Sequence, residues 1–173
     1  MELLYHGTHL RNGLEIAESG AILSPWYKYL EELNGVYRGK EGLFEEHYSG
    51  RTMVDVALEN AAFCYSRNEL EHRVKSLSVS KLLSGCGGAA GYGMQFEEYN
   101  GGGMVLALEI DEELERSLPN DWEDRYIIFV PKRLELKTLR QIHLSPRAAR
   151  EAEKLVRKSF EKYNPEILYL NGD

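Results

Sequence analysis

The sequence is poor in cysteine, has no long apolar run and carries no excess of positive charge. Its two cysteines, Cys64 and Cys86, are too few for a disulfide framework, so we expect reduced thiols. No stretch approaches the roughly 18 apolar residues of a membrane span, and no signal segment opens the chain. The net charge of -7 argues against a broad face that binds nucleic acid. We therefore expect a cytoplasmic protein with no membrane partner.

Repeats, low-complexity tracts and linkers are also missing, which predicts a single domain over residues 1–173. A chain of this length buries roughly two thirds of the surface that its unfolded form exposes. Residues 24–50 differ from the rest because they mix aromatic residues with many turn residues. We expect an irregular aromatic loop there, and long loops of this kind often serve as lids over functional sites.

Hydrophobic periodicity predicts an α+β fold with about three helices and six short strands. One helix is expected to begin with Thr8 as its cap and to stop at Gly20. A second is expected over residues 52–65, and a third after Ser145, which precedes a proline at the first helical position. The expected strands are residues 2–5, 74–79, 104–110, 126–130, 139–144 and 166–170.

The first nine residues are the most informative part of the chain. An apolar run there leads into His6, Gly7 and Thr8, which bring an imidazole, a bare backbone amide and a hydroxyl to one point. Such a group suits the binding of a polar small molecule, although a lone histidine at a strand end is more often structural. His6 and His9 could also pair on a metal, but no third ligand with suitable spacing follows, so no metal site is expected.

Three segments in chain order resemble the ADP-ribosyltransferase fold of the histidine type, which PARP-like and DarT-like enzymes and RNA 2'-phosphotransferases share. They are Leu4-Tyr-His-Gly-Thr8, Ser76-Leu-Ser-Val-Ser80, and Gly103 to Ile110 followed by Glu123 to Pro131. The resemblance implies split antiparallel β-sheets with about three flanking helices. It also implies an enzyme that cleaves the nicotinamide–ribose bond of NAD, its co-substrate, and transfers ADP-ribose to an acceptor. The sequence does not identify this acceptor, which could be protein or nucleic acid.

The resemblance assigns roles to the first motif. His6 would bind the adenosine-side ribose of NAD, and the backbone of Gly7 would bind the carboxamide of the nicotinamide. Thr8 would support the turn that follows.

The second motif supplies further candidates for NAD binding. Ser78 and Ser80 would lie near the reacting ribose, and Tyr92 could stack on the nicotinamide ring. Both serines are also ordinary polar positions on an alternating strand, and aromatic residues are most often simply buried. The glycine-rich run over residues 85–93 matches no phosphate-binding pattern, so we expect a flexible loop over the cleft.

The third motif departs from the family pattern. Direct register puts Arg125 where the family has its catalytic glutamate, at the start of a strand. Glu123 lies two residues earlier and would share a face with Arg125 on an extended chain, so Glu123 is the predicted catalytic carboxylate beside His6. A carboxylate that binds the ribose 2-hydroxyl stabilises the positive charge that develops as the bond breaks.

Two other functions remain open on the same fold. An arginine in the glutamate position would disfavour that positive charge, which favours a catalytically silent module that binds NAD or a protein. An RNA 2'-phosphotransferase-like enzyme is the other alternative, although this acidic chain lacks a clear basic site for RNA phosphate. A local cationic face is expected on the last helix, and it could meet an acidic partner. Its members are Arg147, Arg150, Lys154, Arg157, Lys158 and Lys162.

Overall fold

The computed structural model describes residues 1–24, 76–98 and 100–171. The expected helix over residues 52–65, Cys64 and nearly all of the aromatic loop lie outside these residues. Contacts divide the chain into one unit of residues 1–21, 78–128 and 135–173 and a second of residues 22–77 and 129–134, so the single domain stays a prediction. None of the described helices is long and apolar enough to cross a membrane.

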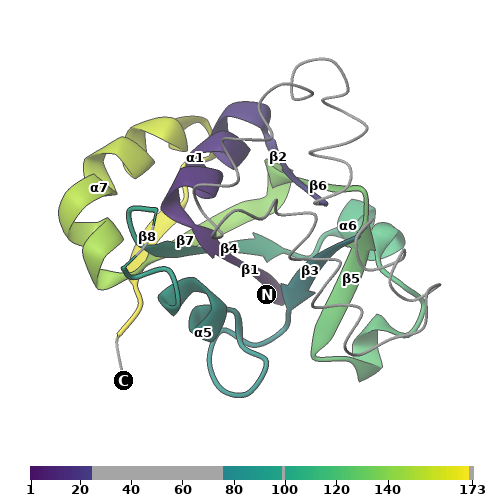
Figure 1. The fold of residues 1–173 in the computed structure, drawn as a ribbon. Coiled ribbons are helices and arrows are strands. Elements are labelled where there is room, and N and C mark those ends of the chain that lie inside the picture. Colours follow the sequence, from purple (N-terminus) through teal and green to yellow (C-terminus); the bar gives the residue numbers. More distant parts are fainter. Residues whose placement is uncertain (25–75, 99, 172–173) are drawn as a thin grey trace, which may run out of the picture. The chain divides into compact units, whose positions relative to one another are not determined.

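The described residues form two β-sheets (Figure 1). A six-stranded mixed sheet has the order β5-β3-β1-β4-β7-β8, in which β4 is antiparallel to both its neighbours and β7 and β8 are parallel. Its strands are β1 (Leu3–His9), β3 (Ser76–Ser80), β4 (Gly103–Glu109), β5 (Ile127–Pro131), β7 (Leu139–Leu144) and β8 (Glu166–Tyr169). The second sheet pairs β2 (Ala21–Leu23) with β6 (Arg133–Glu135).

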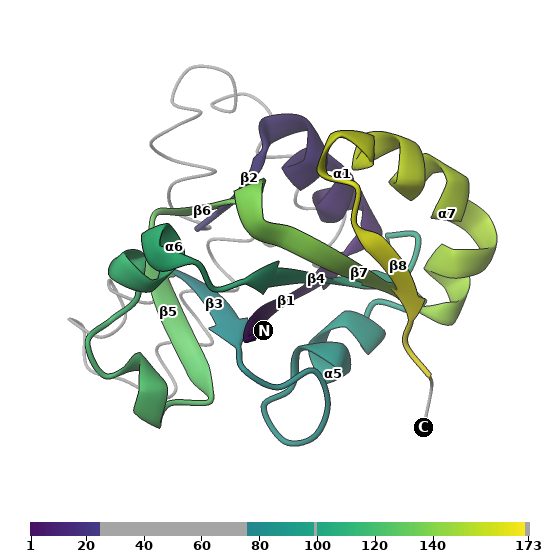
Figure 2. The same ribbon diagram turned by 180° about the vertical axis from the view of Figure 1, so that it is seen from behind.

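Four α-helices accompany these sheets in the described residues, which confirms the predicted α+β class. They are α1 (Leu10–Ser19), α5 (Ala89–Met94), α6 (Glu112–Ser117) and α7 (Pro146–Ser159). α1 and α7 pack together on one face of β1, β4 and β7, whereas α5 packs on the other face of β1 and β4 (Figures 1 and 2). The central strand β4 is therefore covered on both sides, as its continuous apolar sequence predicts.

Neighbouring residues at the start of β4 show how closely both helices approach the sheet. A Cβ atom on Gly103 would lie 1.7 Å from the carbonyl oxygen of Gly93 in α5. On the opposite face, a Cβ atom on Gly13 of α1 would lie 1.8 Å from the sulfur of Met104. Gly103 must be glycine because its neighbour is backbone, whereas a side chain at Gly13 would require the Met104 side chain to move.

The glycine-rich run contains helix α5, so the prediction of a flexible loop over residues 85–93 is wrong. Gly85 and Gly87 take positive φ angles of 87° and 80° in the turn that leads into the helix. A Cβ atom on Gly7 would lie 2.5 Å from the carbonyl oxygen of Ala89. The small residues thus allow a short helix to pack directly on the backbone of β1, and this long-range contact leaves no local signal in the sequence.

Helix α1 ends as predicted but begins one residue later. Gly20 closes it with a φ angle of 78°. Its N-cap is His9, whose Nδ1 accepts a hydrogen bond from the N–H of Asn12 at 3.0 Å. Thr8 is still part of β1 and is buried, and its hydroxyl accepts from the Asn12 amide at 2.7 Å. The cap prediction for Thr8 is wrong because pairing with β4 keeps the chain extended through His9.

Helix α7 begins as its sequence predicts. The hydroxyl of Ser145 accepts a hydrogen bond from the N–H of Ala148 at 3.4 Å, and Pro146 occupies the first turn. The carboxylate of Glu97, from the segment that follows α5, accepts a second bond from the N–H of Arg147 at 2.7 Å. A negative group at a helix N-terminus also stabilises the helix dipole.

Candidate functional site

The two edges of β1 are paired to very different extents. Against β4, the strand is in register over its whole length, from Leu3↔Glu109 to His9↔Gly103. Against β3, the described residues are in register at one pair, Tyr5↔Ser80. The β3 side of β1 is therefore where a ligand could reach the backbone beyond Tyr5.

The backbone of Gly7 is directed to this β3 side. At one end of the β1–β4 pairing, the N–H of Leu10 donates to the carbonyl oxygen of Gly102 at 2.9 Å. At the other end, the N–H of Ile110 donates to the carbonyl oxygen of Glu2 at 3.0 Å. Hydrogen-bonded pairs alternate along an antiparallel ladder, so even-numbered residues of β1 point their backbone groups at β4. Gly7, an odd-numbered residue, points its N–H and C=O the other way.

His6 makes a specific contact at the same place. Its Nδ1–H donates to the carbonyl oxygen of Ser78 over 2.9 Å, which fixes the tautomer and leaves Nε2 as an acceptor. If the register of Tyr5↔Ser80 is continued, Ser78 is the residue opposite Gly7. The imidazole therefore binds the carbonyl group of Ser78, which would pair with Gly7 if β1 and β3 stayed paired further along.

The charge state of His6 follows from its surroundings. The side chain is partly buried, and this desolvation lowers the pKa of His6, while the bond to the Ser78 carbonyl acts in the opposite direction. Because the shift starts from an ordinary value near 6.5, the imidazole is neutral at pH 7. A neutral ring with a free Nε2 accepts a hydrogen bond from a hydroxyl group.

Helix α5 covers Gly7 from the other face of β1. A Cβ atom on Gly7 would lie 3.2 Å from the Cβ atom of Tyr92, whose half-exposed ring packs edge-on against Phe96 at 5.4 Å between centroids. Successive side chains of a strand alternate between faces, so His6 lies on the face opposite to α5. A ligand that contacts both His6 and Tyr92 must cross the edge of β1 at Gly7.

The two serines of the second motif differ in what their side chains do. The buried hydroxyl of Ser80 donates to the carbonyl oxygen of Gly87 at 2.8 Å and accepts from the N–H of Leu82 at 3.0 Å, so it holds the turn before α5. The side chain of Ser78 is exposed, and the contact with His6 uses its backbone carbonyl.

Glu123 lies in a 3-10 helix, Trp122–Asp124, so the extended chain assumed for its position is absent. The N–H of Arg125 donates back to the carbonyl oxygen of Trp122 at 3.1 Å, which curls this segment before β5 begins. The Arg125 guanidinium forms an ion pair with Asp121. The exposed carboxylate of Glu123 makes no hydrogen bond or ion pair with the described residues.

Lys81, which no motif in the sequence marks as functional, holds the Glu123 segment next to the end of β3. The Lys81 ammonium group donates to the carbonyl oxygen of Glu123 at 2.6 Å and lies 4.7 Å from the centroid of the Trp122 ring. Its N–H also donates to the carbonyl oxygen of Tyr126 at 2.9 Å. The only sequence signal is a lysine directly after the serine-rich strand.

The structure thus attaches His6 to β3 and the Glu123 segment to the residue that follows β3. His6 binds Ser78, and Glu123 is held by Lys81, three residues further on. At the rise of an extended chain this separates the two attachment points by roughly 10 Å.

Among known proteins, solved structures match this chain, whereas no family model and no curated protein matches it. DarT from Thermus sp. 2.9 in complex with ADP-ribosylated ssDNA has a TM-score of 0.53 and 13% identity over 98% of this chain and 94% of that one. The same DarT in complex with NAD+ has a TM-score of 0.53 and 10% identity, with 98% and 95% covered. Its complex with carba-NAD+ gives a TM-score of 0.51 and 12% identity, with 98% and 95% covered.

At such low identity the likeness shows the fold, which is that of a DarT-like ADP-ribosyltransferase. The fold expected from the His-Gly-Thr segment and the two later motifs is therefore confirmed.

Proposed function

We propose that the protein is an NAD-dependent ADP-ribosyltransferase, which cleaves the nicotinamide–ribose bond of NAD and passes ADP-ribose to an acceptor. One observation carries this proposal. At the point where β1 and β3 cease to pair, the backbone of Gly7 and a neutral, oriented His6 lie side by side. Support also comes from the fold, because a DarT with the same fold was solved in complex with NAD+.

The backbone groups of Gly7 match the chemistry of a carboxamide. A carboxamide carries one acceptor oxygen and an NH2 donor, and the N–H and C=O of one residue complement both. The missing side chain at Gly7 leaves room for helix α5, which brings Tyr92 next to the strand. The Nε2 of His6 would accept a hydrogen bond from a ribose hydroxyl on the opposite face.

Glu123 is the carboxylate that we assign to bond cleavage. Its side chain is exposed and unpaired among the described residues, so it is available to a ribose hydroxyl. Hydrogen bonding to the 2-hydroxyl would stabilise the positive charge on the ribose as nicotinamide leaves. Lys81 supports this assignment because it holds the backbone of Glu123 next to β3.

Single-stranded DNA is the first acceptor to test, since the matched DarT was solved with ADP-ribosylated ssDNA. Arg125 favours a second function, a silent NAD-binding module, because it stands just before β5 where a glutamate would be expected.

Nicotinamide release from NAD, followed with the purified protein with and without ssDNA, separates these functions. We expect release by the wild type and a loss of at least tenfold in His6→Ala and Glu123→Gln. Glu98→Gln, which removes one exposed carboxylate elsewhere, should match the wild type.

Tight NAD binding without release would instead support the silent module, and Arg125→Glu should then generate release. If Glu123→Gln keeps full activity, the carboxylate is assigned to the wrong residue. If the wild type neither binds nor cleaves NAD, the proposed function is wrong.

A further inference from the structure

Helix α7 presents a cationic face to solvent. Its buried residues Ala148, Ala152 and Val156 face the sheet, so the basic side chains lie on the outer side. In and just after this helix are six cations: Arg147, Arg150, Lys154, Arg157, Lys158 and Lys162. The whole chain carries a net charge of -7, so this face differs in sign from the average surface.

Two of these cations are neutralised by acidic neighbours. Arg147 pairs with Glu151 at 3.1 Å. Arg157 pairs with Glu153 at 2.7 Å, and the Tyr169 hydroxyl donates to the same carboxylate at 3.0 Å.

Three others form a row along the helix. Arg150, Lys154 and Lys158 are each four residues apart, which spaces them about 6 Å along the axis on one side of the helix. All three are exposed and have no ion pair with the described residues. We refer to these three residues as the basic row.

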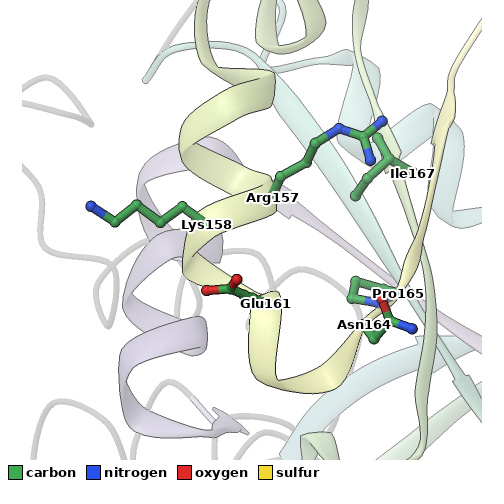
Figure 3. Close-up of a pocket in the computed structure, with 6 residues that line it drawn as sticks. All are labelled: Arg157, Lys158, Glu161, Asn164, Pro165 and Ile167. Carbon is green, nitrogen blue, oxygen red and sulfur yellow. The ribbon is translucent and has the colours of Figure 1, made fainter.

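The basic row ends at a hollow of about 330 Å³ (Figure 3). Lys158 belongs to the basic row and also lines the hollow, with its side chain directed away from Pro165 and Ile167. Arg157 and Glu161 line the helical side of the hollow. Across from them lie the apolar side chains of Pro165 and Ile167 and the amide of Asn164; together these are its lining residues. The hollow combines apolar surface with an amide, the Arg157 guanidinium that is paired with Glu153, and the Glu161 carboxylate. This lining suits the sugar or base of a nucleotide, whereas phosphates would need the unpaired cations of the basic row.

We propose that the basic row and this hollow bind single-stranded nucleic acid, with phosphates along the row and one nucleotide in the hollow. The evenly repeated cations fit a repeating chain of phosphates better than an acidic peptide, whose charges have no fixed interval. Because the remaining surface is acidic overall, a polyanion is directed to this face. The inference rests on the proposed function in one respect: the bound nucleic acid would be the acceptor of ADP-ribose.

Binding of a fluorescent 20-nucleotide dT strand, measured by anisotropy without NAD, tests the surface independently of catalysis. The test variant is Arg150→Gln/Lys154→Gln/Lys158→Gln. A matched control, Arg116→Gln/Lys137→Gln/Arg140→Gln, removes three charges from other elements; these side chains bind the Glu112 carbonyl, Glu113 and Glu109. Asn164→Asp adds a carboxylate at the hollow, and aspartate tolerates the positive φ of 48° there.

We expect at least tenfold weaker binding in the test variant and near wild-type binding in the control. The slope of log affinity against log salt concentration should become smaller by about 2, because each of the three lost phosphate contacts contributes roughly 0.7. Asn164→Asp should weaken binding several-fold. Equal losses in test and control variants, no binding by the wild type, or tighter binding of a poly-glutamate peptide would overturn the inference. Nicotinamide release without DNA should be unchanged in the test variant, so a failed surface and a failed enzyme give different results.

Discussion

The two edges of β1 differ: one pairs fully with β4, and the other carries the residues that we propose to bind NAD. Along β4, the strand is paired over its whole length and contributes to a continuous core. Along β3, the described residues are in register at one pair, and beyond it the ring of His6 binds the carbonyl oxygen of Ser78. Even-numbered residues of β1 point their backbone groups at β4 and odd-numbered residues point them at β3, because hydrogen-bonded pairs alternate along the strand. The proposed site is thus the edge of β1 that faces β3.

The largest loss of stability should come from a substitution in β4 where it contacts α5. In Gly103→Ala, the new Cβ atom would lie 1.7 Å from the carbonyl oxygen of Gly93, so the contact between β4 and α5 must open. We expect the free energy of unfolding, from urea denaturation, to fall by about 3 kcal/mol.

Gly91→Ala is the matched control for this substitution. Gly91 lies in the same helix α5, but nothing lies within 4 Å of a Cβ atom there. Stability should stay the same or rise by up to about 1 kcal/mol, because alanine restricts the unfolded chain. Similar losses in both variants would show that α5 does not depend on close glycine contacts.

The two serines of β3 should differ in how much they contribute to stability. Ser80→Ala removes two buried hydrogen bonds, to Gly87 and Leu82, and should lower the free energy of unfolding by about 1 to 2 kcal/mol. Ser78→Ala should change stability by less than about 0.5 kcal/mol and leave NAD affinity unchanged, since the contact with His6 uses the backbone. Thermal denaturation and NAD titration of both variants measure this difference. A reversed order of stability would contradict it.

On the β3 side of β1, Lys81→Met should impair catalysis without weakening NAD binding. Lys81 holds the backbone of Glu123, so its loss lets the proposed carboxylate move away from the reacting ribose. We expect kcat for nicotinamide release to fall about tenfold at nearly constant KM. Lys81→Arg should restore part of the rate, and Lys137→Met, at an exposed ion pair, should have no effect. An increase in KM alone would argue that Lys81 acts on substrate binding instead.

The smallest change in stability should come from lowering the pH. Burial lowers the pKa of His6 and that of His143, where the charge of Glu166 partly opposes it. Both residues therefore take up protons at a lower pH in the folded state than in the unfolded chain, where histidine titrates near pH 6.5. The free energy of unfolding should therefore be fully developed above pH 7 and should decrease as the pH falls below 6.5.

His143→Gln should make this decrease smaller, because one of the two groups no longer titrates. Urea denaturation at pH 7.5 and pH 5.5 gives the comparison. An equal or larger decrease in the variant would show that His143 does not contribute.

Much of the fold follows from local sequence signals. The start of α7 at Ser145 and Pro146, the end of α1 at Gly20 and the strand over residues 139–144 were all predictable, because each depends on neighbouring residues. Helix α5 was not, since its stability comes from contacts with Gly7 and Gly103 that are distant in sequence. For the same reason the cap of α1 was misplaced, as pairing with β4 decides where β1 ends.

The candidate site was predictable in its residue types but not in its geometry. The His-Gly pair was identified from its motif, and the fold that this motif predicted is confirmed. The roles of the individual residues stay predictions. The contact of His6 with a backbone carbonyl and the hold of Lys81 on Glu123 leave no pattern in the sequence. Backbone acceptors are present at every residue, so only the fold selects one of them.

The carboxylate of Glu97 at the first turn of α7 offers a practical consequence. It connects the segment after α5, on one face of the sheet, with a helix on the other face through a single bond to the Arg147 N–H. A molecule that displaces α5 would weaken this bond, and the nitrogen and proton NMR frequencies of that amide would change. Arg147 could therefore serve as an intrinsic probe for screening small compounds, with no label introduced near Tyr92.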